Sequence, residues 1–374
     1  MGLDGELEMM HRLAAYLGEL TTVVGHAGRV RPLIDYCAGL LVTEGRRNAE
    51  TMAVVTKPAQ VSVQHQKLMH VVANSEWSDD EVLAKVRGLV VPSMTRRGPI
   101  EFWIIDDTSF PKQGKHSVGV QRQYCGQLGK QANCQVTVTL SIANHHASLP
   151  IAYRLYLPRV WADDKARRKK AHVPASVRFK TKPQIALDQI RAALLAGIAP
   201  GVVLMDASYG NNSILRQAIT GLGLAYVAAI MSTTKVRPVR EGDAKPPRVS
   251  VEALALSLPK RTWRTVTWRE GTNKKLRSRF ARVRVRVSPI RGVVPKRRCS
   301  SSGPRARQSP PNTGSQPSTR TCRCAGLSIS PSCAGVSSMI IATSSRKSAS
   351  AIMRAAAGGD SIITARCASH HTVS

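Results

Sequence analysis

Residues 135–157 read QVTVTLSIANHHASLPIAYRLYL, and this segment sets the architecture expected of the chain. Gln135–Ala143 alternates apolar and polar residues and is rich in β-branched side chains, which predicts a strand. Residues 144–148 (NHHAS) are typical of a turn, and Leu149–Leu157 predicts a second strand. We therefore expect these two strands to form a β-hairpin.

The segments around this hairpin alternate between strand and helix patterns. Glu101–Asp106 (EFWIID) predicts a short strand buried on both faces. Thr181 is placed to cap a helix that carries Pro183 in its first turn. That helix has an expected buried stripe of Ile185, Leu187, Ile190 and Leu194, and it is followed by a predicted strand at Val202–Asp206, a helix at Ser213–Leu222 and a strand at Ala225–Met231. This order predicts an α/β sheet with flanking helices.

Residues 30–90 carry helical patterns instead. Apolar residues recur at three-to-four spacing in Pro32–Leu41 and Gln66–Ala73. Ser78, followed three residues later by Glu81, is a typical helix start. A compact helical N-terminal part is expected, whose basic side chains either face DNA or lie on solvated helix faces: Arg46, Arg47, Lys67 and His70.

The net charge is strongly positive and unevenly distributed. The 374 residues contain 55 Lys and Arg against 23 Asp and Glu, a formal charge of +32, which indicates a polyanionic partner. Residues 1–270 hold 36 basic and 22 acidic side chains, whereas residues 271–374 hold 19 and 1. No aromatic residue follows Phe280. Two different kinds of sequence are joined, so the charge of each must be considered separately.

Several protein classes are excluded by composition. The acidic start MGLDGELEMM does not resemble a signal peptide, and no apolar run approaches the roughly 20 residues of a membrane span. The eight cysteines lack zinc-site spacing, so reduced thiols in the cytoplasm are expected. No Gly-rich phosphate loop is present. The histidine pairs 145–146 and 370–371 lack partners at metal-ligand spacing, and solvent exposure is expected for them.

Two acids stand out by their position. Asp106 and Asp206 each end a predicted strand, and strand ends are where open α/β sheets bind ligands. Carboxylates suit Mg²⁺ or Mn²⁺, and two such ions about 3.5–4 Å apart could activate water and stabilise the leaving oxygen in phosphodiester cleavage. The alternative is local: Asp107 would form an Asx-type turn and Asp206 would cap a helix.

Four segments resemble one known family. Ile104–Gly126 resembles the first catalytic block of the DDE transposases of bacterial insertion sequences, in the branch of DDE-superfamily endonucleases. Val203–Asn211 resembles their second block, and Leu157–Trp161 and Phe179–Pro183 are similar to the segments between the two blocks. The resemblance covers roughly residues 30–285.

This resemblance implies a fold and a set of site residues. The fold would be an RNase H-like mixed α/β sheet that cuts DNA at element ends and joins the 3′ ends to a target. Asp106 would be the first metal-binding acid, Asp206 the second, and Asp107 a neighbouring acid that is not a ligand. Three cations are expected to contact DNA phosphates, with solvated loop charges as the alternative: Lys112, Lys115 and Arg122.

The same resemblance implies domains and partners. We expect a helical DNA-binding domain at residues 1–95, an incomplete catalytic core at 96–285 and a disordered basic tail at 286–374. The expected partners are the element's terminal inverted repeats and target DNA, bound by a homodimer in the bacterial cytoplasm at the nucleoid. No membrane partner is expected, and the cofactor would be Mg²⁺ or Mn²⁺ at a compromised two-metal site.

The family pattern also requires a third acid, a Glu within a motif resembling Arg-Trp-Arg-Ile-Glu. No Glu follows Glu270. Family-like strings, back-translated and read one base downstream, reproduce residues 303–307, 332–338 and 354–364 in order and in one phase. A frameshift between about Arg284 and Cys299 is therefore predicted. The alternative is a natural Ser/Arg-rich disordered tail that binds nucleic acid.

Three functional hypotheses follow from these features. The first is an insertion-sequence transposase that is inactive as encoded. The second is a DNA-binding protein without catalysis, which would compete for element ends as a truncated transposase. The third is a different RNase H-like nuclease that takes its third acid from elsewhere, with Asp163, Asp164 and Glu252 as candidates.

Overall fold

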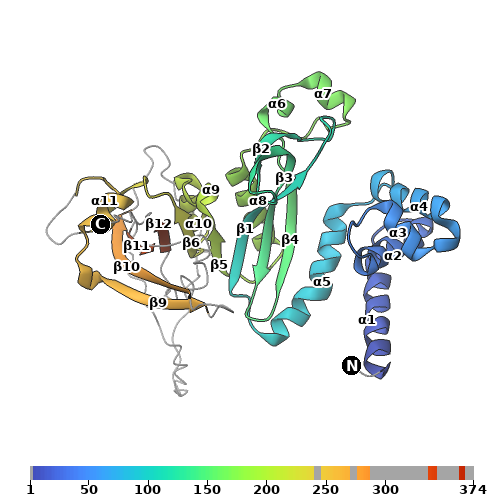
Figure 1. Cartoon of the computed structure of the whole chain (residues 1–374), viewed down its shortest axis with the longest axis horizontal. Helices are drawn as coiled ribbons and strands as arrows, with labels where there is room; N and C mark the ends of the chain where they lie inside the picture. Colours follow the sequence, from blue (N-terminus) through green and yellow to red (C-terminus); the bar gives the residue numbers. More distant parts are fainter. Residues whose placement is uncertain (1–2, 240–245, 270–275, 287–335, 343–361, 367–374) are drawn as a thin grey trace, which may run out of the picture. The chain divides into compact units, whose positions relative to one another are not determined.

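A computed structural model describes residues 3–239, 246–269, 276–286, 336–342 and 362–366 (Figure 1). Its contacts divide the chain into two compact units, Met1–Val202 and Val203–Ser374, and each unit is described by itself. The boundaries expected at residues 95 and 285 remain predictions.

The first unit begins with a helical part. It consists of α1 (Leu3–Thr21), α2 (Ala27–Val42), α3 (Ala49–Thr56), the 3₁₀ turn η1 (Pro58–Gln60), α4 (Val61–Ala73) and α5 (Asp79–Arg97). Met52, Ala53 and Leu68 form its small core. The Ser78 hydroxyl accepts a hydrogen bond from the Glu81 amide at 3.2 Å, so the predicted start of α5 is confirmed.

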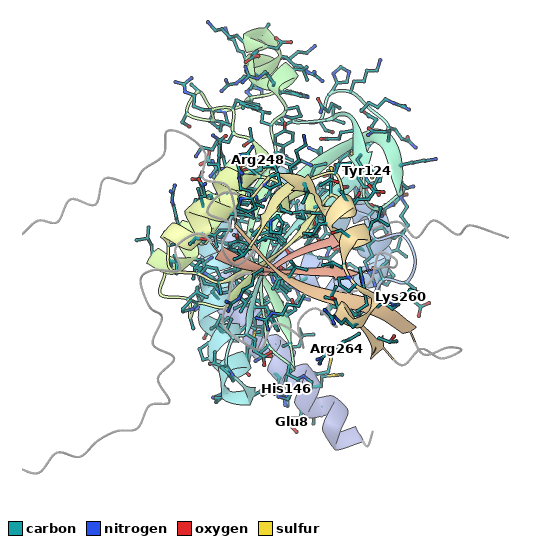
Figure 2. The ribbon with its side chains drawn as sticks, turned by 90° about the vertical axis from the view of Figure 1, so that its left-hand side faces the viewer. Glu8, Tyr124, His146, Arg248, Lys260 and Arg264 are labelled. Atoms are coloured by element: carbon teal, nitrogen blue, oxygen red, sulfur yellow. The ribbon has the colours of Figure 1, made fainter. Side chains whose placement is uncertain are left out.

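The sheet of the first unit is antiparallel. It contains β1 (Phe102–Pro111), β2 (Gln121–Cys125), β3 (Lys130–Ala143) and β4 (Ser148–Leu155), with β3 between β1 and β2 and β4 also paired to β3. The predicted hairpin is confirmed as β3 and β4, and His146 is exposed in its turn (Figure 2). Asn144 of this turn is buried, and its amide nitrogen donates to the carbonyls of Met94 and Gly98, which fastens the end of α5 to the hairpin.

Three helices complete the first unit: α6 (Arg159–Ala162), α7 (Lys165–Lys170) and α8 (Lys182–Leu195). The predicted capping of α8 is confirmed, because the Thr181 hydroxyl and the Gln184 side chain form a reciprocal capping box. The buried face differs in part from the predicted stripe, since Leu187 and Leu194 are only half-buried. It consists of Ile185, Ala186, Gln189, Ile190 and Ala193.

The second unit has a mixed sheet. Its strands are β5 (Val202–Met205), β6 (Tyr226–Ile230), β7 (Lys235–Pro238), β8 (Val249–Ser250), β9 (Trp263–Arg269), β10 (Leu276–Arg286), β11 (Val336–Ala342) and β12 (Ile362–Arg366). The helices are α9 (Ala207–Gly210), α10 (Ser213–Gly221), α11 (Val251–Ser257) and the 3₁₀ turn η2 (Lys260–Thr262). Strands β5, β6, β12 and β11 pair with one another in this order and are parallel. β10 pairs antiparallel with β11, β9 and β7.

The fold class expected from the sequence is confirmed: a mixed α/β sheet with flanking helices follows a helical N-terminal part. Two details differ from expectation. β1 does not end at Asp106 but continues to Pro111, because its second half pairs with β3 from Asp107↔Val138 to Pro111↔Cys134. Two segments of the expected disordered tail, β11 and β12, are strands. The rest of that tail, and the proposed frameshift boundary beyond Arg286, lie outside the described residues.

Candidate active site

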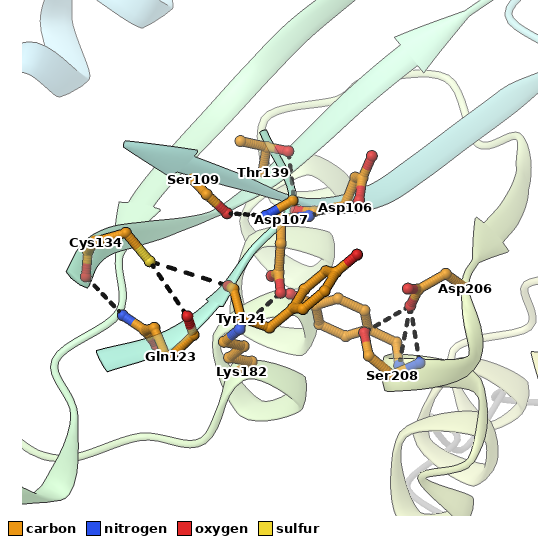
Figure 3. Close-up of polar contacts among 12 residues, drawn as sticks. Asp106, Asp107, Ser109, Gln123, Tyr124, Cys134, Thr139, Lys182, Asp206 and Ser208 are labelled. Carbon is orange, nitrogen blue, oxygen red and sulfur yellow. Dashed lines mark hydrogen bonds and ion pairs between the residues drawn. The ribbon is translucent and has the colours of Figure 1, made fainter. Parts of the chain in front are cut away.

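Asp106 lies in the middle of β1, at the point where the strand passes from core to solvent. Ile105 before it is 2% exposed, whereas Asp106 itself is exposed. The Asp107 amide donates to Asp106 Oδ1 at 2.7 Å, and the Thr139 hydroxyl donates to the Asp106 carbonyl at 3.0 Å (Figure 3). The backbone of Asp106 is thus fixed by β3 while its carboxylate faces outward.

Asp107 points differently and has a different partner. Its Oδ2 accepts a hydrogen bond from Lys182 Nζ at 2.7 Å, and both side chains are about one-quarter exposed, at 24% and 28%. Lys182 is the first residue of α8, so this ion pair joins the start of the helix to β1 (Figure 3). The Lys182 ammonium also lies 5.6 Å from the centre of the Tyr156 ring. Asp107 is therefore paired with a cation of its own unit.

A buried thiol also lies close to this ion pair. Burial raises the pKa of Cys134, the neighbouring Cys125 adds to that rise, and the positive charge of Lys182 opposes it. Both cysteines are fully buried in a small cluster with Val136. They are packing residues of β2 and β3, and β3 pairs with the strand that carries the two acids.

Asp206 follows β5 in the second unit and caps α9. Its Oδ1 accepts hydrogen bonds from the Ser208 amide at 2.9 Å, the Ser208 hydroxyl at 2.6 Å and the Tyr209 amide at 3.3 Å (Figure 3). The local alternative considered for this residue, a helix cap, is correct as geometry. These three bonds all end on Oδ1, so they do not involve Oδ2 of Asp206, and the side chain is exposed.

The residues after Asp206 explain why its position is so well defined. Tyr209 is buried, and Gly210 lies so close to the Ala229 carbonyl of β6 that a side chain would collide with it. Asn211 Oδ1 accepts from the Met231 amide at 3.1 Å and from the Thr234 hydroxyl at 3.0 Å. The short helix α9, with Asp206 at its start, is therefore held against β6 and the residues that follow this strand.

Arg216 of α10 is buried and also contacts the chain after Asp206. Its guanidinium donates to the Gly210 carbonyl, and burial lowers the pKa of Arg216. A cation buried here still has its charge at neutral pH, because an arginine starts from a very high pKa. It supports the chain beside Asp206 and was not singled out by the sequence pattern.

The two acids suit a divalent cation in donor type, since both offer carboxylate oxygens. They fall short of the family pattern in number. In the described part of the chain, no group of three or more His, Cys, Asp and Glu side chains lies together to hold a metal ion. Because Asp106 and Asp206 belong to different units, each is located within its own unit only.

The alternative acids have local structural positions. Asp163 follows α6, and Asp164 Oδ1 accepts from the Arg167 amide at 2.8 Å as the cap of α7. Glu252 lies in the first turn of α11 in the second unit. Asp164 therefore caps a helix, as Asp206 does, and the helix that it caps has the sequence KARRKK.

The three predicted phosphate contacts all lie exposed in the first unit. Lys112 and Arg122 are both neighbours of Asn133 in β3. The Asn133 side chain donates to the Lys112 carbonyl at 2.8 Å. Arg122 of β2 lies opposite Asn133 in the pairing of β2 with β3. The Lys115 carbonyl accepts from the Arg167 guanidinium at 2.8 Å, which joins the β1–β2 connection to α7.

Comparison with known proteins gives two findings. Residues 19–275 match the family described as DDE superfamily endonuclease. The chain is also 31% identical over 168 residues to the "Probable transposase for insertion sequence element IS701" of Microchaete diplosiphon. That alignment covers 45% of this chain and 41% of the relative, so the chain spans less than half of the relative's length. In the described residues, none of the helices is both long and apolar enough to cross a membrane.

Proposed function

Because the chain belongs to the DDE superfamily endonucleases, we propose that it derives from an insertion-sequence transposase that cuts and joins DNA. Asp106 and Asp206 would be the first two of the three metal-binding acids. One observation carries the assignment: each is an exposed carboxylate that accepts a hydrogen bond from a backbone amide one or two residues later, within the matched residues 19–275. The match to a probable transposase supports the reaction class.

The proposed cofactor is a divalent ion, Mg²⁺ or Mn²⁺. Bound ions would supply an activated water and charge stabilisation at the leaving oxygen. The protein's own contribution is orientation. Three donors fix the Asp206 carboxylate, β3 fixes the Asp106 backbone, and Lys182 pairs with Asp107. That pairing supports a role for Asp107 as a neighbouring acid that is not a ligand.

We further propose that the encoded chain is catalytically silent. The sequence holds no Glu after Glu270, and the family match ends at residue 275. A frameshift between about Arg284 and Cys299 would account for both facts. A site with two acids in place of three loses one anchor for its metal ions, and both affinity and geometry depend on the number of ligands.

The proposed partners and boundaries follow the family. The helical residues 1–95 would bind the terminal inverted repeats, residues 96–285 would form the incomplete core, and a homodimer would act on DNA at the nucleoid. The exposed cations Lys112, Lys115 and Arg122 would contact phosphates, since a basic surface is the usual footprint of DNA binding.

A second candidate is DNA binding without cleavage. The exposed cations of the β1–β2 region favour it, because they do not depend on the missing acid.

Two experiments test the proposal. Sequencing the encoding DNA tests the frame: stop codons in the plus-one frame opposite residues 299–374, with no Arg-Trp-Arg-Ile-Glu string, would rule the frameshift out. Calorimetric titration with Mn²⁺ tests the acids. We expect weak binding that is lost in Asp106→Asn and Asp206→Asn, and the Glu252→Gln variant is the matched control that should retain it. Binding unchanged in both Asp variants would refute the assignment.

A further inference from the structure

We propose that α6, α7 and the residues after them form a separate contact for the DNA phosphate backbone. We call residues 159–178 the α7 knob. The inference rests on the proposed function, because it takes DNA as the substrate. The surface that it describes does not include the acids Asp106, Asp107 and Asp206. Figure 1 shows α6 and α7 at one end of the first unit's sheet, beyond β2 and β3.

The sequence of α7 is KARRKK, and the structure divides its cations into two groups. Arg167 and Arg168 are half-buried and bind their own protein, whereas Lys165, Lys169 and Lys170 are exposed. In the described part of the chain, no carboxylate lies within ion-pair distance of these three lysines.

The two arginines fasten the knob. The Arg167 guanidinium stacks on the Trp161 ring, 3.6 Å from its centre, and donates to the Lys115 carbonyl. The Arg168 guanidinium donates to three carbonyls, those of Ala162 at 3.3 Å, Pro174 at 3.0 Å and Val177 at 2.7 Å. A planar guanidinium is suited to such multiple contacts, which a lysine could not make.

The knob also has its own apolar anchor in the core. Trp161 is 1% exposed and packs with Val120 and Leu157, and its indole N–H donates to the Val120 carbonyl at 2.8 Å. Val173 and Val177 pack against the same cluster. The lysines are therefore presented on a supported surface, which lowers the entropy cost of binding a charged partner.

The charge of the knob suits a phosphate backbone. Residues 159–178 contain Arg159, Arg178 and five cations of α7 against only Asp163 and Asp164, of which Asp164 is occupied as the α7 cap. The bond from Arg167 to Lys115 places the β1–β2 connection, with its own exposed lysines, against α7. Lysine ammonium groups without base-reading geometry bind phosphates irrespective of sequence, so the expected partner is the DNA backbone.

The test is a salt titration of binding to a short DNA duplex of arbitrary sequence, followed by fluorescence anisotropy, with the full chain. Log K falls as log salt rises, and each phosphate contact makes this slope steeper by about 0.9. The triple variant K165A/K169A/K170A should make the slope shallower by about 2.7. The triple Lys→Arg variant should keep the slope of the parent chain. Because these lysines are exposed, the variants should fold normally, which circular dichroism checks.

The control removes the same charge elsewhere. Lys260, Arg261 and Arg264 are exposed in the second unit, and Figure 2 labels Lys260 and Arg264. The triple variant K260A/R261A/R264A should change the slope much less. An equal loss in both triple variants would overturn the inference, because net charge would then set binding.

The remaining outcomes separate the two proposals. A chain that binds duplex DNA with an unchanged slope after K165A/K169A/K170A overturns the α7 knob and leaves the proposed function intact. A chain that binds no duplex DNA at any salt concentration overturns both. Tighter, lysine-dependent binding to single-stranded RNA than to duplex DNA would overturn the choice of partner.

Discussion

At the residue scale, two adjacent acids of β1 have been given separate environments by strand geometry. Successive side chains of a strand point to opposite faces, so Asp106 faces solvent while Asp107 meets Lys182. Asp206 differs from both, because it is also a helix cap. Substitutions at these three positions should therefore separate stability from metal binding.

The double role of Asp206 predicts that two substitutions differ in stability but have the same effect on metal binding. Asp206→Asn keeps an oxygen acceptor for Ser208 and Tyr209, so the free energy of unfolding should change by less than about 0.5 kcal/mol. Asp206→Ala removes the cap and should cost about 1 kcal/mol. Both should lose Mn²⁺ binding. Urea unfolding and calorimetry measure the two effects, and an Ala variant as stable as the Asn variant would contradict the capping role.

The ion pair between Asp107 and Lys182 should contribute modestly to stability. It is partly buried, so a coupling energy of about 1 kcal/mol is expected from a double-mutant cycle with Asp107→Asn and Lys182→Met. The cycle is measured by urea unfolding, and each single variant should retain Mn²⁺ binding. Loss of Mn²⁺ binding in Asp107→Asn would instead make Asp107 a ligand.

At the element scale, features that depend on nearby residues were predictable, whereas a strand end that depends on distant pairing was not. The β3–β4 hairpin and the caps of α5 and α8 follow from alternation and from local side-chain hydrogen bonds. The extension of β1 past Asp106 was missed because its pairing partner lies in β3, far along the chain. Strand pairing at that distance leaves no local pattern.

The candidate site divides in the same way. Asp106, Asp206 and the exposed cations were found from strand position and resemblance. Lys182 and Arg216 were missed as site neighbours, because both contacts form only when separate segments pack together. Lys182 of α8 meets Asp107 of β1. Arg216 of α10 meets the Gly210 carbonyl at the end of α9. The inward and outward cations of α7 could not be told apart either, since KARRKK has no large apolar residue that marks a buried face.

The division of the α7 cations predicts unequal effects on stability. Arg168→Ala removes donors to three carbonyls and should destabilise the α7 knob by about 1–3 kcal/mol, whereas Lys169→Ala should stay within about 0.5 kcal/mol of the parent. Hydrogen exchange of residues 159–178 reports this local stability. Equal exchange in the two variants would contradict the inward placement of Arg168.

The end of α7 offers a backbone test. His172 adopts φ +52°, in the left-handed region that β-branched residues disfavour. Its side chain is exposed, so replacement changes little else. His172→Val should be less stable than His172→Gly by about 1 kcal/mol in the same unfolding assay. A Val variant as stable as the Gly variant would show that this turn takes another conformation.

At the scale of the whole molecule, the net charge of +32 combines two contributions. The first 270 residues hold a moderate excess of cations, which includes the exposed lysines of the β1–β2 connection and of α7. The remainder belongs to residues 271–374, which the family match hardly reaches. We propose that DNA binds to the first part, and that a shifted reading frame is the reason for the composition of the second.

We propose that two acids remain from a three-acid site. Mn²⁺-dependent nicking of a plasmid that carries the element's ends tests this proposal, with the encoded chain and a chain whose frame is restored after residue 284. We predict no nicking by the encoded chain, and nicking by the restored chain that Asp106→Asn or Asp206→Asn abolishes. Nicking by the encoded chain at the restored chain's rate, or nicking that survives both substitutions, would contradict the account.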